Sequence, residues 1–293
     1  MPTAVIRLHA DAAGAARVSA VLEDTLPLDE MTVSSFEDPA DESRWTVEVY
    51  GGPNVGTGHL ETAVRAALGP DAAAFELQRE ELGDADWVAA SLEGLDPVRA
   101  GRFFVHGGHD AHRVPANAHA IRVEAALAFG TGHHGTTLGC LLALDSLLKL
   151  RRPAAILDLG TGTGVLAMAA AMATRGPVLA SDIDPVSVTI TRENARLNRV
   201  AHLVDVVEAT GFDAPQIRAR GPYDLILANI LAAPLIALAP DMARHAAPRA
   251  TLILSGLLNA QERAVAGAYL ARGFHLGGRR RISGWSTLTL LRG

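Results

Sequence analysis

The residues best suited to chemistry form the run from Asp158 to Gly164, DLGTGTG. Apolar residues 154–157 precede it and an alanine-rich segment of helical character follows, so we expect a strand, a glycine loop and a helix. Glycines at alternate positions let the backbone turn tightly and approach a ligand closely, and the next helix offers free N–H groups at its N-terminus. The pattern predicts a site for a nucleotide-like cofactor.

Two classes of cofactor fit this loop. Residues 162–167 match the dinucleotide pattern G-x-G-x-x-[GA], and Asp182 falls about where an acid that binds ribose is expected. Asp158, however, stands two residues before the first glycine, where its carboxylate would repel a pyrophosphate and suit a ligand with an ammonium group. This favours S-adenosyl-L-methionine over NAD, and tight packing is the alternative explanation of a turn rich in glycine and threonine.

Polar residues also end two further expected strands. Asp182 is placed to bind two ribose hydroxyls, although aspartate also favours caps and turns. Asp184, directly before Pro185, fits the N-cap of a helix. Asn229 lies among apolar neighbours, where its side chain needs partners unless it is a satisfied loop asparagine. Since parallel strands share one carboxyl edge, these residues and the glycine loop should border one crevice.

Residues 129–137, FGTGHHGTT, precede the helix that leads to the first of these strands. They should lie near the crevice and could close over it, and Thr136 or Thr137 can cap the helix. The adjacent histidines His133 and His134 invite a metal interpretation. We expect no metal, because adjacent histidines seldom share one tetrahedral ion and no cysteine or acid completes a set.

Two domains must position these residues. The order β-α-β-β-α-β over the first 79 residues, with a last strand at 73–79, predicts a small α+β ferredoxin-like domain. From residue 121 onward strands and helices alternate, and two strands at 274–281 and 285–291 look like a terminal hairpin. This predicts a Rossmann-like, doubly wound α/β sheet with one antiparallel strand. We assign residues 1–95 to substrate recognition, 96–120 to a linker and 121–293 to the cofactor domain.

Composition excludes several classes of protein. The chain has 293 residues, 49% of them hydrophobic, and can bury a large core. Its net charge of -6 argues against a surface that coats nucleic acid and leaves a basic protein partner open. The single cysteine, Cys140, excludes an internal disulfide and fits a reducing cytosol. No apolar stretch can span a bilayer and no signal peptide is evident, so we expect a cytoplasmic monomer.

The motifs together resemble one family, the bacterial methyltransferases of ribosomal large-subunit protein L-eleven. The similarity lies in FGTGHHGTT (129–137), DLGTGTG (158–164), DIDP (182–185), ANIL (228–231) and SGLL (255–258). The glycine loop fits many methyltransferases, whereas Phe-Gly-Thr-Gly combined with Asn-Ile-Leu is far more specific. The likeness extends from about Asp86 to the C-terminus. Gly135 and Thr163 depart from the family, in which proline and serine are frequent there.

The resemblance implies a class I methyltransferase that uses S-adenosyl-L-methionine. By it, Thr137, Gly160, Asp182 and Asn229 match the family's cofactor contacts. Further residues of the two glycine-containing motifs lie nearby, namely Phe129, Gly130, Thr131, Asp158, Gly162 and Gly164. The implied reaction methylates the N-terminal α-amine and lysine ε-amines of L-eleven, free or on the ribosome, without a membrane or sequence-specific nucleic acid. Asn229 is then the residue that places the amine, and no dedicated general base is needed because the sulfonium is already activated.

Other functions remain alternatives at this point. A methyltransferase acting on another protein, small-molecule or nucleic-acid amine is the closest, because an asparagine at the fourth strand also serves such substrates. An inactive cofactor-binding scaffold is disfavoured by the intact motif residues. An NAD-dependent reductase lacks a Tyr-x-x-x-Lys pair. The first domain, as a protein-recognition module, favours a protein substrate.

Overall fold

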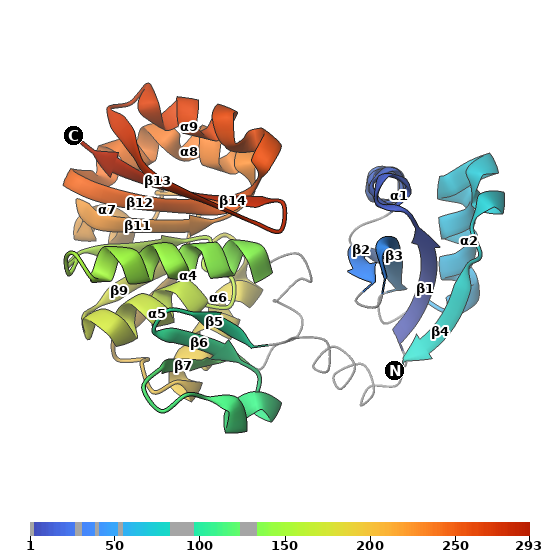
Figure 1. Cartoon of the computed structure of the whole chain (residues 1–293), viewed down its shortest axis with the longest axis horizontal. Coiled ribbons are helices and arrows are strands. Elements are labelled where there is room, and N and C mark those ends of the chain that lie inside the picture. The colour runs from blue at the N-terminus through green and yellow to red at the C-terminus, as the bar shows by residue number, and fades with distance from the viewer. Residues whose placement is uncertain (1–2, 27–30, 39–40, 52–54, 83–96, 124–133) are drawn as a thin grey trace. The chain divides into compact units, whose positions relative to one another are not determined.

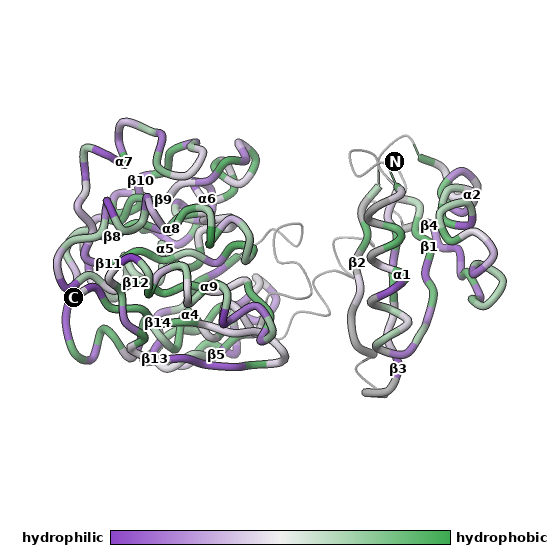
Figure 2. The backbone as a smooth tube through the Cα atoms, turned by 90° about the horizontal axis from the view of Figure 1, so that it is seen from above, coloured by the Kyte–Doolittle hydropathy of each residue, from purple (hydrophilic) through white to green (hydrophobic). Residues whose placement is uncertain are grey.

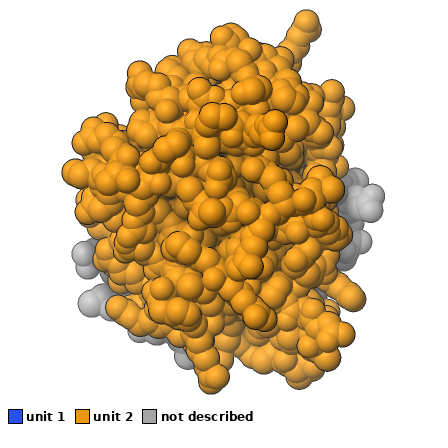
Figure 3. Space-filling model, turned by 90° about the vertical axis from the view of Figure 1, so that its left-hand side faces the viewer, with its two compact units in different colours: residues 1–94 blue, residues 95–293 orange. Residues whose placement is uncertain are grey.

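The computed structural model describes residues 3–26, 31–38, 41–51, 55–82, 97–123 and 134–293 (Figure 1). The chain divides into two compact units, Met1–Gly94 with one apolar core and Leu95–Gly293 with two. Figure 3 shows one face of the second unit. Among the described residues, no helix is long and apolar enough to cross a membrane.

The first unit has the predicted element order. Its elements are β1 (Thr3–Ala10), α1 (Ala12–Thr25), β2 (Met31–Asp38), β3 (Asp41–Gly51), α2 (Thr57–Leu68), η1 (Gly69–Ala74) and β4 (Gln78–Leu82). The strands form an antiparallel sheet in the order β2-β3-β1-β4. Leu22 of α1 and Leu60 of α2 are fully buried in one core with Ile6 and Val49 of the sheet. The last strand begins later than residue 73 because the preceding residues, with a proline in the first turn, form the 3-10 helix η1.

The second unit is built on a mostly parallel, seven-stranded sheet. Its strands are β8 (Ile156–Leu159), β9 (Val178–Asp182), β10 (Val204–Glu208), β11 (Tyr223–Asn229), β12 (Ala246–Leu258), β13 (Phe274–Ile282) and β14 (Trp285–Arg292). They lie in the order β10-β9-β8-β11-β12-β14-β13, and β14 is antiparallel to both of its neighbours. The predicted α/β sheet with a terminal hairpin is confirmed. The order of the strands reverses between β8 and β11, because β9 and β10 extend the sheet on one side of β8 whereas β11 and β12 extend it on the other. An open α/β sheet binds its ligands at such a point.

Helices cover both faces of this sheet. They are α4 (His134–Leu148), α5 (Val165–Thr174), α6 (Pro185–Leu197), α7 (Pro215–Arg220), α8 (Ala232–His245) and α9 (Glu262–Leu270), with a 3-10 turn η3 (Asn259–Gln261) before α9. One core joins α4, α5 and α6 to one face, and a second joins α7, α8 and α9 to the other. Figure 2 shows α5 as an almost continuously hydrophobic segment. A helix that is apolar all round is one that is enclosed on all sides.

The segment expected to be a linker, residues 96–120, instead contains ordered strands of the second unit. β5 (Val98–Ala100), β6 (Phe103–His106) and β7 (His119–Arg122) form a small sheet, with the 3-10 helix η2 (Gly108–Arg113) between the last two. The β5–β6 turn contacts α4: Arg102 Nε lies 2.6 Å from Asp145 Oδ1, and a Cβ at Gly101 would lie 2.4 Å from Asp145 Oδ2. Only glycine therefore lets this turn approach the helix so closely.

Candidate functional site

The glycine loop between β8 and α5 has a left-handed backbone at each of its glycines. Gly160, Gly162 and Gly164 have φ angles of 68°, 55° and 81°. A Cβ at Gly160 would lie 2.2 Å from Ile230 Cγ2, and one at Gly164 would lie 2.8 Å from Thr191 Cγ2. At Gly162, in contrast, nothing lies within 4 Å of the position of a Cβ. The outer two glycines therefore serve close packing, whereas Gly162 has open space beside it in which a ligand can approach the backbone.

Asp158, on β8, binds the loop through its side chain. Its side chain is buried, with 1% of the residue exposed. Its Oδ2 atom accepts hydrogen bonds from Thr161 Oγ1 at 2.7 Å and from the backbone N–H of Ala167 at 3.0 Å. Oδ1 is buried and has no hydrogen-bond partner among the described residues. One oxygen is thus committed to the loop and to the first turn of α5, and the other is a buried acceptor that a ligand could use.

Asp182 ends β9 and connects the loop to α6. Its Oδ2 accepts a hydrogen bond from the N–H of Gly162 at 2.8 Å, and its Oδ1 accepts one from the N–H of Asp184 at 3.1 Å. The carboxylate has acceptor capacity beyond these two bonds. Asp184 accepts hydrogen bonds from the N–H groups of Val186 and Ser187. The prediction that Asp184 is the N-cap of α6 is confirmed.

Asn229 is the last residue of β11. Its Nδ2 donates a hydrogen bond of 3.2 Å to Thr136 Oγ1 of α4, and its Oδ1 is buried without a partner among the described residues. Leu227 pairs with Asp158 across the β8–β11 interface, so Asn229, two residues further, is on the same face of the sheet as Asp158. Two acceptor oxygens without partners therefore lie on one face beside the point where the chain reverses. Buried polar atoms of this kind require an explanation, and a ligand supplies one.

The element at residues 129–137 is described only in its second half. Phe129, Gly130 and Thr131, which the sequence places near the cofactor, lie outside the described residues. Thr136 and Thr137 are buried within the first turn of α4, which begins at His134, rather than at its cap. Of this element, the structure thus brings Thr136 to Asn229 and leaves Thr137 one residue away in the same turn.

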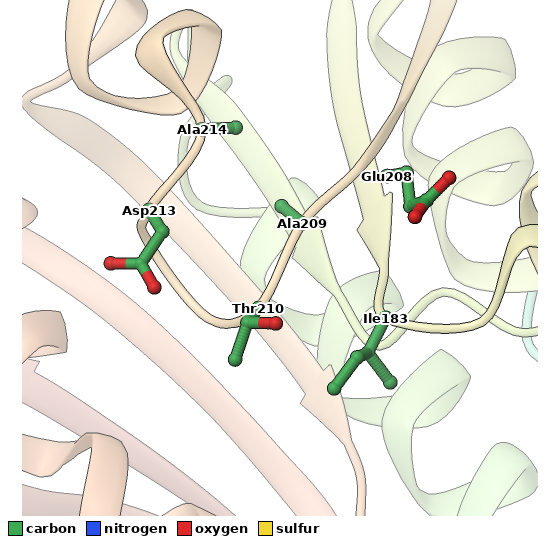
Figure 4. A pocket seen from close by; sticks show the side chains of 6 residues that line it. All are labelled: Ile183, Glu208, Ala209, Thr210, Asp213 and Ala214. Carbon is green, nitrogen blue, oxygen red and sulfur yellow. The ribbon is translucent and has the colours of Figure 1, made fainter.

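A pocket of about 280 Å³ adjoins Asp182 and was missed by the sequence analysis. It is lined by Ile183, Glu208, Ala209, Thr210, Asp213 and Ala214 (Figure 4). Glu208 is paired with Asp182 in the sheet, and the N–H of Ala209 donates to the carbonyl of Asp182 at 2.8 Å. The signal that could have found it is the acidic residue Glu208 at the carboxyl end of β10, the strand beside β9. In the described parts of the chain, no group of three or more His, Cys, Asp or Glu residues could hold a metal ion.

Comparison with known proteins identifies the family. The model of the family described as "Ribosomal protein L11 methyltransferase (PrmA)" matches residues 11–292. The chain belongs to this family. L11 is the L-eleven of the resemblance, so the family predicted from the five motifs is confirmed, and with it the enzyme class, a methyltransferase.

Individual members of the L11 methyltransferase family match over almost the whole chain. Proteins of that name from Rhodopseudomonas palustris (strain BisB5) and Bradyrhizobium diazoefficiens are each 52% identical, over 96% and 95% of this chain and 94% and 93% of their own lengths. The crystal structure of a ribosomal protein L11 methylase from Lactobacillus delbrueckii subsp. bulgaricus matches with a TM-score of 0.60 and 28% identity. It covers 68% of this chain and 99% of that one. The sequence comparison and the fold comparison therefore agree on the family.

Asp158 should make the stability of this L11 methyltransferase family member depend on pH. Burial raises the pKa of Asp158 from 3.8 to about 6. The hydrogen bonds from Thr161 and Ala167 lower this pKa, but by less than burial raises it, and the charge of Asp182 raises it further. Between pH 3.8 and about pH 6, this carboxyl group is mostly ionised in the unfolded chain and mostly protonated in the folded chain. The free energy of unfolding should therefore fall as pH rises, by about 3 kcal/mol in total through this group.

The variant Asp158→Asn should lack this loss. Urea denaturation of both proteins from pH 4 to pH 7 should show the variant gaining stability relative to the wild type as pH rises. Asp184→Asn is the control, because backbone and side-chain hydrogen bonds lower the pKa of Asp184 and its substitution should not reproduce the trend. A difference between wild type and Asp158→Asn that stays constant over this range would contradict the prediction.

Proposed function

We propose that this protein transfers methyl groups from S-adenosyl-L-methionine to amines of ribosomal protein L11, namely the N-terminal α-amine and lysine ε-amines. The observation that carries the proposal is the buried amide oxygen of Asn229, an acceptor without a partner among the described residues, beside the glycine loop at the reversal point of the sheet. The name of the family supplies the protein substrate. Because that substrate is ribosomal, we place the reaction in the cytoplasm, with the enzyme acting as a monomer on free or ribosome-bound L11.

The residues present fit the cofactor. Gly162 leaves open space beside the loop, Asp182 has acceptor capacity for the ribose hydroxyls, and the pocket that contains Ile183 and Glu208 adjoins Asp182 where a nucleobase would follow. Gly160 shapes the loop, and Thr137 belongs to the turn of α4 next to Asn229. When bound, S-adenosyl-L-methionine supplies a methyl group already activated on a sulfonium.

The chain must then present a neutral, oriented amine. A lysine has a pKa of about 10.4 in water, so its ammonium form, which has no free electron pair, dominates at pH 7. Burial of the amine lowers that pKa. Asn229 Oδ1 can accept an N–H of the neutral amine and direct its electron pair. As an uncharged acceptor, it stabilises the ammonium less than a carboxylate would. Its Nδ2 is held by Thr136, which leaves Oδ1 for this role.

The first unit, Met1–Gly94, is the proposed recognition module. Its helices pack on one face of its sheet, and alternation places Arg7, Glu48 and Glu80 on the other face, where Arg7 pairs with both glutamates at 2.6 Å and 3.0 Å. Glu48 is buried, whereas Arg7 and Glu80 are partly exposed and suit a polar protein surface better than a small apolar substrate.

Methylation of L11 tests the proposal directly. The enzyme is incubated with methyl-labelled S-adenosyl-L-methionine and a total extract of ribosomal proteins, and the labelled peptides are mapped by mass spectrometry. We expect one labelled protein, L11, modified at its α-amine and at lysines. Label in a different protein, in RNA or in small molecules instead would favour the alternative of another amine substrate.

Substitution of Asn229 should affect rate more than cofactor affinity. Displacing an amine by about 1 Å can cost on the order of a hundredfold in rate, and we expect a loss of that size for Asn229→Ala in single turnovers at saturating cofactor. Asn229→Leu should fail for want of an acceptor, and Asn229→Asp because a carboxylate stabilises the ammonium. A wild-type rate for Asn229→Ala would reduce this residue to a structural asparagine.

Substitution of Asp182 should affect cofactor affinity. Asp182→Ala removes acceptors for the ribose and should weaken binding of S-adenosylhomocysteine by about 1–3 kcal/mol in calorimetry. Asp184→Ala is the matched control, since it removes a helix cap two residues away without removing the proposed ligand contact. Equal losses of affinity in both variants would mean that Asp182 acts only through the local fold.

Removal of the first unit should separate binding from recognition. A fragment of residues 95–293 keeps β5–β7, which pack on α4, and every described residue of the cofactor site. It should bind S-adenosylhomocysteine as the whole chain does and methylate L11 far more slowly. Methylation of L11 at the full rate by this fragment would refute the proposed role of the first unit.

A further inference from the structure

Two side chains of α6 bind the carbonyl groups of the glycine loop. Thr191 Oγ1 donates a hydrogen bond of 2.8 Å to the carbonyl of Gly162, and Asn194 Nδ2 donates one of 2.9 Å to the carbonyl of Thr163. The two residues are three positions apart and so share one face of the helix. Both are buried, with 0% and 4% of their surface exposed.

We propose that Thr191 and Asn194 are positioning residues of the cofactor site. They hold two successive peptide groups of the loop in the orientation in which the loop receives S-adenosyl-L-methionine. This inference rests on the proposed function only in taking the glycine loop as the cofactor site. Neither residue needs to contact the cofactor, because both act through the backbone of Gly162 and Thr163.

The loop needs such support because of its glycines. Glycine has more backbone freedom to lose than any other residue, and fixing one residue costs about 1–2 kcal/mol in conformational entropy. A loop that had to become ordered on binding would subtract this cost from the affinity for the cofactor. A loop that is already held does not. Thr191 and Asn194 therefore contribute to affinity by ordering the loop before the ligand arrives.

Gly162 is held on both of its sides. Its N–H donates to Asp182 Oδ2 at 2.8 Å, and its carbonyl accepts from Thr191. Asp182 in turn accepts from the N–H of Asp184, the N-cap of α6. Helix α6 thus fixes the loop relative to Asp182, whose carboxylate is proposed to bind the ribose.

The methyl group of Thr191 has a second role beside that of its hydroxyl. Its Cγ2 atom would lie 2.8 Å from a Cβ at Gly164, so it occupies the space that only glycine leaves free there. Valine keeps this methyl group and removes the hydroxyl, whereas serine keeps the hydroxyl and removes the methyl group. The pair of variants separates the hydrogen bond from the packing.

The experiment measures binding of S-adenosylhomocysteine to the full-length protein by calorimetry. Thr191→Val should raise the Kd about tenfold, the upper range for one neutral hydrogen bond, and Thr191→Ser should stay within about twofold of the wild type. Thr174→Val is the matched control. Thr174, in α5, is also buried, with 1% exposed, and its hydroxyl also donates to a backbone carbonyl, that of Ala170, but it does not contact the loop.

A second measurement observes the loop without ligand. Backbone amides of residues 160–164 should exchange hydrogen faster in Thr191→Val than in the wild type, and Thr174→Val should leave their exchange unchanged. Melting temperatures show whether the two valine variants lose similar global stability.

The outcomes distinguish a failure of the positioning role from a failure of the proposed cofactor site. Wild-type affinity in Thr191→Val, or equal losses of affinity in Thr191→Val and Thr174→Val, would overturn the positioning role. Failure of the wild type itself to bind S-adenosylhomocysteine would instead overturn the cofactor site on which the proposed function depends.

Discussion

The proposed cofactor site depends on keeping three left-handed glycines in one fixed loop. Gly160, Gly162 and Gly164 all have positive φ, and such a backbone is free to rearrange unless its peptide groups are bound. Strand β9 supplies part of this support, since the carbonyl of Ser181 accepts hydrogen bonds from the N–H groups of Gly160 and Thr161 at 2.8 Å and 2.9 Å. Asp158 and α6 supply the remainder. The loop is therefore an ordered part of the sheet edge, held by the elements on either side of it.

Beside this ordered loop lie two buried polar atoms that destabilise the fold. Asp158 Oδ1 and Asn229 Oδ1 are buried acceptors without partners in the described part of the chain. Each such atom costs about 1–3 kcal/mol while it lacks a partner. Proteins keep arrangements of this kind where function requires them and balance them with stability from elsewhere. Here the balance comes from two apolar cores, one on each face of the sheet. The first buries most of α5, and both contain residues of β8 and β11.

Short strands limited what could be predicted about the domains. Residues 98–122 contain three strands of three or four residues, too few for a period of two to be recognised, and the glycine, histidine and proline residues among them resemble a loop. Tertiary contacts show that this segment belongs to the second unit: its apolar side chains share a core with α4 and α5, and Arg102 and Gly101 contact Asp145. The ordered β5–β7 sheet is therefore a product of packing against α4 rather than of local preference.

The sequence alone determined the features that depend on neighbouring residues. The glycine loop, the N-cap at Asp184, the terminal hairpin and the alternation of strands and helices follow from patterns a few residues long, and the motifs together identified the family. The tertiary structure decided which side chains meet. Thr191 and Asn194 lie 29 and 31 residues from the carbonyls they bind, and Asn229 lies 93 residues from Thr136. Periodicity shows which face of an element is buried, but the partner that a polar side chain finds there depends on the order of the strands and on the helix that covers them.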